Sequence, residues 1–131
     1  MVFYDEPFLT LSWEEDGGIV RAQWKNEVTS EPMRQGLERG LDLVKLKSAQ
    51  HWLVDSRSLG SIDPADVKWV NDHWMPRAVD AGLRFMAFVM AKKVVMQLTM
   101  KSFIARINER DLTTAYFDDL DAARAWLRSQ S

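Results

Sequence analysis

Cysteine is absent from this chain of 131 residues, and long apolar runs are absent too. A chain without cysteine has no disulfides, no thiolate metal sites and no thiol catalysis. No apolar run approaches the roughly 18 residues that a membrane span requires. The first residues, MVFYDEPF, are acidic and lack the basic region and apolar core of a signal peptide. We therefore expect a cytoplasmic protein that does not span a membrane.

The chain also lacks a large excess of either positive or negative charge. The chain has 17 basic and 19 acidic residues, for a net charge of −2. Nucleic-acid-binding domains usually present a basic face, so we expect no nucleic-acid partner. One region is richer in basic residues, and we interpret it as a solvated helix face. Its members are Lys92, Lys93, Lys101, Arg106 and Arg110.

Length and composition predict one domain over residues 1–131. Hydrophobic residues make up 47% of the chain, which argues against disorder. Near the start, apolar residues alternate with polar ones over 9–13 and again over 20–25. The turn residues Asp16, Gly17 and Gly18 lie between these two segments. This pattern predicts a β-hairpin with one buried face.

Helical and extended patterns then alternate along the rest of the chain. Ser30 is a candidate N-cap for a helix whose apolar stripe runs from Met33 to Val44. Asp63 and Pro64 begin a second helix, which Pro76 should kink or split near residues 72–75. We expect a short helix over 92–98, another capped by Thr99, and a last one capped by Asp118 or Asp119 in which Arg124 points to solvent.

Three apolar segments are typical of strands, at residues 51–54, 83–90 and 113–117. Strands that alternate with helices favour a parallel arrangement. We therefore predict an α/β fold with an N-terminal hairpin followed by βα units. The expected sheet is mostly parallel and five-stranded, with about four helices.

Several segments resemble the SpoIIAA-like family of the STAS fold. They are WLVDSR at 52–57, WMPRA at 74–78, AGLRFMAFVM at 81–90 and YFDDLDAARAWL at 116–127. The resemblance implies a small stand-alone bacterial domain of undefined biochemical role. Anti-sigma-factor antagonists of this fold carry a phosphorylated serine where this chain has Pro64, so the resemblance does not extend to that switch. CRAL-TRIO domains share the architecture and bind lipids, which is an analogy of fold alone.

Asp55, Ser56 and Arg57 follow a predicted parallel strand, which we expect to end at Asp55. Ligands of open α/β sheets bind at such strand ends, and residues 91–92 and 118–119 should reach the same edge. The alternative is that Asp55 only fixes the turn. A serine hydrolase using Ser56 and His73 is not favoured, because the glycine-flanked nucleophile elbow is missing. We expect no enzymatic activity.

The two histidines, His51 and His73, do not predict a metal site. They lack the close spacing of a zinc motif, even with Asp66 or Asp72 as further ligands. We therefore expect no metal and no other cofactor.

The aromatic helix after residue 63 offers a recognition surface. Trp69 and His73 share one side of it, and Trp74 should face the sheet. Our leading hypothesis is a non-enzymatic binding or interaction module with a regulatory role that forms a homodimer. The tentative binding residues are Asp55, Ser56, Arg57, Asp63, Trp69, His73, Trp74 and Arg77.

Two alternatives stay open. The protein could carry a small apolar or lipid-like ligand beneath the kinked helix, in a cavity lined by Trp74, Met75, Met90 and Met96. It could also be a phospho-switch on one of the serines between the third strand and this helix. These are Ser56, Ser58 and Ser61.

Overall fold

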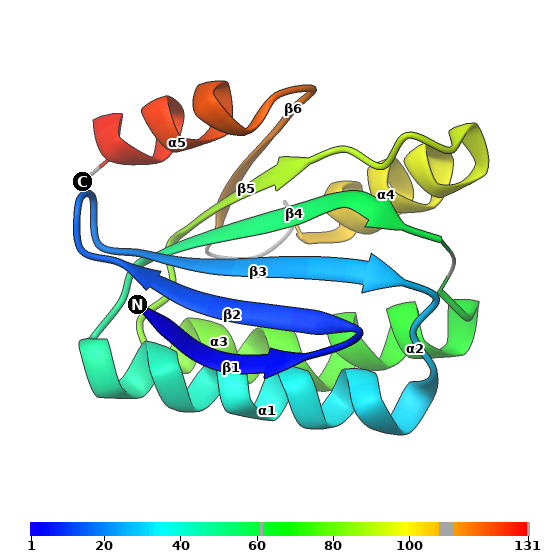
Figure 1. The fold of residues 1–131 in the computed structure, drawn as a ribbon, viewed down its shortest axis with the longest axis horizontal. Coiled ribbons are helices and arrows are strands. Elements are labelled where there is room, and N and C mark those ends of the chain that lie inside the picture. The colour runs from blue at the N-terminus through cyan, green and yellow to red at the C-terminus, as the bar shows by residue number, and fades with distance from the viewer. Residues whose placement is uncertain (61, 108–111, 131) are drawn as a thin grey trace.

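A computed structural model describes residues 1–60, 62–107 and 112–130. The fold is built on one six-stranded sheet whose strands lie in chain order, β1-β2-β3-β4-β5-β6 (Figure 1). The pairs β1–β2 and β2–β3 are antiparallel, and strands β3 to β6 run parallel to one another. The strands are β1 (Val2–Glu6), β2 (Leu9–Glu14), β3 (Ile19–Asn26), β4 (His51–Leu59), β5 (Phe85–Val89) and β6 (Thr113–Phe117).

The predicted α/β architecture is confirmed, with one strand more than expected. The additional strand, β1, lies at the edge of the sheet, and its register with β2 shifts between Val2 and Tyr4. Its residues are exposed or half-buried, so they lack the alternation that marks β2 and β3. The predicted hairpin is present, with Leu9 opposite Trp24 and Glu14 opposite Ile19.

Helices cover both faces of the sheet (Figure 1). Long α1 and the segment α2–η1–α3 lie on one face, and α5 lies on the other. The buried residues of α1, α3 and α4 join the larger core, whereas α5 packs on a second, smaller one. The helices are α1 (Ser30–Lys47), α2 (Pro64–Trp69), the π-helix η1 (Val70–Trp74), α3 (Met75–Asp80), α4 (Val94–Ile107) and α5 (Leu120–Ser129).

Glycines on α1 let this helix approach the sheet closely. A Cβ atom at Gly40 would lie 2.4 Å from Cη2 of Trp52, and one at Gly36 would lie 2.5 Å from Cδ2 of Leu9. These distances are well inside van der Waals contact. Close packing on the sheet therefore explains why this helix tolerates the cost of two glycines in stability.

The helix breaks just before Pro76, as the sequence predicted, and the break takes the form of a π-turn. The backbone N–H of Met75 donates to the carbonyl of Val70, five residues earlier. Pro76 follows at once, and a proline ring clashes with the carbonyl four residues before it in a regular α-helix. The wider turn removes that conflict and carries Trp74 into the core, where it is 1% exposed.

Some predicted boundaries were wrong. Strand β4 continues to Leu59, so residues 56–59 are extended rather than irregular. The two helices predicted over 92–107 are one helix, α4, and the Thr99 hydroxyl donates to the Val95 carbonyl inside it at 3.2 Å. The N-cap of α1 is Thr29 rather than Ser30. The last helix is capped by Asp119, which accepts from the N–H of Asp121 at 2.8 Å.

Candidate functional site

The motif at residues 55–57 lies inside strand β4, so its side chains are divided between the two faces of the sheet. Side chains alternate along a strand. Asp55 and Arg57 therefore point to the same side as Leu53, which packs in the α5 core. Ser56 points to the opposite side and lines a cavity there. The single ligand crevice that the sequence suggested at the end of this strand is not formed by these three residues.

Asp55 is buried, with 2% of its side chain exposed, and two arginines neutralise it. Arg57 donates from Nε to Oδ1 and from Nη2 to Oδ2, both at 2.9 Å. Arg21 on β3 donates to Oδ2 at 3.3 Å. Burial alone would raise the pKa of Asp55, but these hydrogen bonds outweigh it and hold the pKa below its ordinary value. A carboxylate with a lowered pKa is a poor general base, so the arrangement favours a structural role.

A second ion pair joins α5 to the same face of the sheet. Arg124 donates from Nε and Nη2 to the carboxylate of Glu14, at 2.9 and 2.7 Å. The expectation that Arg124 points to solvent was therefore wrong, since its side chain is only 21% exposed. Helix spacing placed this residue outside the apolar stripe, but it could not show that β2 supplies an acidic partner.

The opposite face of the sheet holds an apolar cavity of about 90 Å³ that is partly open to solvent. It lies between the sheet and the helices α1, α2, η1 and α4. Its lining is almost wholly apolar, and Ser56 and Thr99 are the hydroxyl-bearing residues in it. The other lining residues are Trp24, Met33, Leu37, Trp52, Val54, Leu59, Ile62, Val67, Val70, Trp74, Met75, Met86, Phe88, Met96, Met100 and Phe103.

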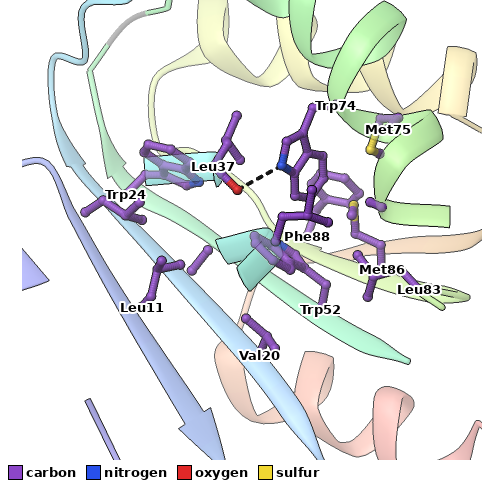
Figure 2. Packing of buried hydrophobic residues seen from close by; sticks show 14 of the residues in the cluster. Leu11, Val20, Trp24, Leu37, Trp52, Trp74, Met75, Leu83, Met86 and Phe88 are labelled. Atoms are coloured by element: carbon purple, nitrogen blue, oxygen red, sulfur yellow. Dashed lines mark hydrogen bonds between the residues drawn. The ribbon is translucent and has the colours of Figure 1, made fainter. Parts of the chain in front are cut away.

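Trp74 lines this cavity, and its side chain is packed among other core residues (Figure 2). Its indole Nε1 donates to the carbonyl of Leu37 on α1 at 2.9 Å. Its ring meets Trp52 edge to face, with 5.0 Å between the ring centroids. Because a buried indole N–H needs a partner, this hydrogen bond holds one orientation of the ring. Trp74 therefore joins α1, the π-turn and β4.

Methionines line much of the cavity, five of the seven in the chain. Of the four residues predicted to line a cavity, Trp74, Met75 and Met96 do so. Met90 does not line it, although it is buried in the core. Sequence reasoning missed the contributions of α1 and β5, such as Leu37 and Phe88, because only the packing of these elements brings them to the kinked helix.

The side of the helix that carries Trp69 and His73 is only partly open. His73 is exposed, but Trp69 is half-buried and the Arg34 guanidinium lies 4.8 Å from its ring centroid. Beneath this contact, Asp66 is 1% exposed. Asp66 accepts a hydrogen bond from the Ser30 hydroxyl at 2.7 Å. Trp69 thus helps to dock α2 on α1.

The remaining candidates have local partners. Asp63 caps α2 and accepts from the N–H of Ala65 at 2.8 Å. Arg77 donates to Glu38 on α1, with Nη2 2.7 Å from Oε2. His51, at the start of β4, stacks on Phe85 with 5.3 Å between ring centroids. These residues stabilise elements and do not converge with Asp55.

The three candidate phosphoacceptors differ in access. Ser56 is 2% exposed inside β4, so a kinase could reach it only after the strand opened. Ser58 is exposed on the same strand. Ser61 lies outside the described residues, as does Arg110 of the basic region.

Two further features concern metals and membranes. Over residues 1–60, 62–107 and 112–130, no three histidine, aspartate or glutamate side chains are grouped as metal ligands would be. Over the same residues, no helix has the length and apolarity needed to cross a bilayer.

Comparison with known proteins agrees with this architecture. An uncharacterised protein of the DUF3478 family with a SpoIIAA-like fold, from Shewanella loihica PV-4, superposes with a TM-score of 0.57 and 14% sequence identity. The match covers 91% of each chain, and at this identity it shows the fold alone. No curated protein matches the sequence. The model of the SpoIIAA-like family matches residues 19–128. This chain therefore belongs to the SpoIIAA-like family.

Proposed function

We propose that this protein is a non-enzymatic binding module for a small apolar molecule, held between the sheet and the kinked helix. The observation that carries the proposal is the apolar cavity beside the π-turn. Interiors are normally packed without voids larger than a water molecule. A partly open apolar cavity of about 90 Å³ leaves its lining side chains incompletely packed, and a bound apolar molecule would complete that packing.

The size and lining of the cavity indicate the class of ligand. About 10–15 Å³ suffices for one water molecule, and an engineered apolar cavity of about 150 Å³ binds benzene. This cavity lies between these values, so it suits a short acyl chain, whereas a ring the size of benzene requires the cavity to widen. Its methionines adapt to irregular shapes, and their side chains can rearrange around a larger ligand. Few polar groups are available to hold an ionic head inside it.

The π-turn is a second observation that supports a binding site beside this helix. Such turns recur at functional sites, where they displace part of a helix from its regular path. Val67 on α2 and Val70, the first residue of the π-turn, are half-buried and line the cavity. Phe103 of α4 is also half-buried. These residues mark the side from which a ligand would gain access.

The interaction-module hypothesis receives less support from the aromatic helix. Arg34 and α1 already contact Trp69, so the predicted aromatic face is smaller than the spacing of its residues implied. A homodimer, a regulatory role and a cytoplasmic location remain predictions. The phospho-switch also remains one, and it now rests on Ser58 and Ser61, because Ser56 is buried.

A short neutral bromoalkane such as 1-bromobutane, which matches the size of this cavity, can serve as a probe of ligand binding. Three tryptophans line the cavity, at positions 24, 52 and 74. A bromine atom bound beside them should quench their emission by the heavy-atom effect in a saturable, one-to-one titration. We expect Val67→Phe, which adds bulk at the mouth of the cavity, to weaken binding roughly tenfold. Native mass spectrometry of gently purified protein should also show a bound mass.

Val2→Phe is the matched control. Val2 is 61% exposed on β1 and does not line the cavity. The same substitution there should leave the probe affinity unchanged. A titration without saturation, or equal loss of affinity in both variants, would reject the cavity as the binding site.

A further inference from the structure

The outer face of α4 exposes large apolar side chains. Val94, Val95 and Leu98 are 68%, 75% and 64% exposed. Val94 and Val95 precede Leu98 by four and three residues, so all three lie on one side of the helix. The opposite side is buried in the core through Met96, Met100 and Ile104. Helix α4 is therefore apolar on both sides, although only one side has a partner within the protein.

Basic residues precede and follow this exposed apolar segment. From residue 92 to residue 107 the chain contains no aspartate or glutamate, in a protein whose net charge is −2. Lys92, Lys93 and Lys101 are exposed, and none of the three forms an ion pair with a described residue. Lys101 lies over the ring of Tyr116 at 5.8 Å. Tyr116, on edge strand β6, is itself 52% exposed.

We propose that the outer face of α4 docks on a membrane surface that contains anionic lipids. Apolar side chains on one side of a helix bury in the boundary between headgroups and acyl chains, and lysines beside them are attracted to anionic headgroups. Val94, Val95 and Leu98 would supply the apolar contact. Lys92, Lys93 and Lys101 would supply the attraction. The helix lies on the surface and does not cross the bilayer.

The charges favour a lipid surface over a second copy of the chain. A two-fold interface centred on this face would bring the lysines of both copies together without acidic partners from α4. Like charges placed together oppose association. An anionic bilayer instead attracts all three lysines.

Flotation with lipid vesicles tests the proposal directly. We expect the protein to float with vesicles of phosphatidylcholine and phosphatidylglycerol at low ionic strength, and to be released as the salt concentration rises. Vesicles of phosphatidylcholine alone should retain much less protein. The double variant Lys92→Gln/Lys93→Gln should partition about 25-fold more weakly, at about fivefold per lysine.

The apolar contribution has a matched control. Val95→Ser/Leu98→Ser should abolish flotation. Leu46→Ser should leave it unchanged, because Leu46 is equally exposed at 67% and also lies between lysines, but on α1. Circular dichroism should show the same helix content in these variants, since every altered side chain is exposed.

Three flotation outcomes would overturn the proposal. They are no flotation with anionic vesicles, equal binding to neutral vesicles, or equal loss in Leu46→Ser. A dimer in light scattering that disappears in Val95→Ser/Leu98→Ser would also overturn it, because the face would then join two copies. The proposal is independent of the cavity: Val95→Ser/Leu98→Ser should bind the neutral probe as the unaltered protein does.

Discussion

Arg57 donates two parallel hydrogen bonds to the carboxylate of Asp55, which lies two residues earlier on the same strand. The pair exists because residues two apart on a strand share one face. Arg21 on the neighbouring strand β3 completes the neutralisation at 3.3 Å. The sequence placed Asp55 at the end of a strand, but the structure places it inside one, where its charge is 2% exposed and fully paired.

Asp55→Asn should destabilise the fold by about 2 kcal/mol, because it weakens charged hydrogen bonds and leaves two arginines without their shared anion. Both arginines keep some access to water, which limits the loss. Urea denaturation measures the effect. Asp80→Asn, at an exposed position on α3, is the control and should change stability by no more than about 0.5 kcal/mol.

The same pair predicts a pH dependence. The folded-state pKa of Asp55 is lower than its unfolded value of about 3.9, so its stabilisation is present above that pH and is lost as pH falls through the folded pKa. The difference in unfolding free energy between the unaltered protein and Asp55→Asn should therefore be largest near neutral pH and shrink below about pH 4. A difference that stays constant down to pH 3 would contradict this assignment.

Gly40→Ala should destabilise the protein although alanine is the better helix former. The added Cβ would lie 2.4 Å from the Trp52 ring, which is 1% exposed and cannot move away freely. Overpacking of this kind costs about 1–3 kcal/mol, more than the gain of about 1 kcal/mol in helix propensity. Thermal and urea denaturation should both show the loss.

Gly36→Ala provides the comparison. Its Cβ would meet the end of the Leu9 side chain, which can change rotamer more easily than an indole ring can. The loss should therefore be smaller than for Gly40→Ala. A reversed order would mean that the α1–sheet contact is looser at Trp52 than the structure shows.

Ser30→Ala should cost about 1–2 kcal/mol because it removes the hydroxyl that donates to buried Asp66 at 2.7 Å. Thr29→Ala should change stability by no more than about 0.5 kcal/mol, since the Thr29 side chain makes no capping hydrogen bond. A capping role for Ser30, which the sequence suggested, would instead make the α1 helix itself fray. Chemical denaturation and helix content by circular dichroism distinguish the two cases.

Much of the fold was predictable because its signals are local. The β2–β3 hairpin has alternating residues and a glycine turn, and residues 113–117 form the strand that was expected. The N-cap Asp63 and the break before Pro76 also lie where the sequence placed them. Each of these depends on neighbouring residues, so a linear pattern contains it.

The errors arose where distant partners change the meaning of a residue. An aspartate after a short apolar run usually indicates the end of a strand. Asp55 instead lies within the sheet, where Arg21 and Arg57 neutralise its charge. Helix spacing alone predicts that Arg124 faces solvent. In the structure it donates hydrogen bonds to Glu14, which is 110 positions away in the chain. Strand β1 forms by pairing at an edge, which its own residues do not indicate.

The candidate site divides in the same way. The sequence alone determined that the helix breaks near Pro76, that Trp74 faces the sheet and that methionines are frequent in this part of the chain. Residue spacing and residue type are enough to fix these features. Only the tertiary structure decided that these features enclose a cavity and that the motif at 55–57 does not form a single ligand crevice. A cavity is space left between elements that pack together, and no segment read by itself specifies how much space its neighbours leave.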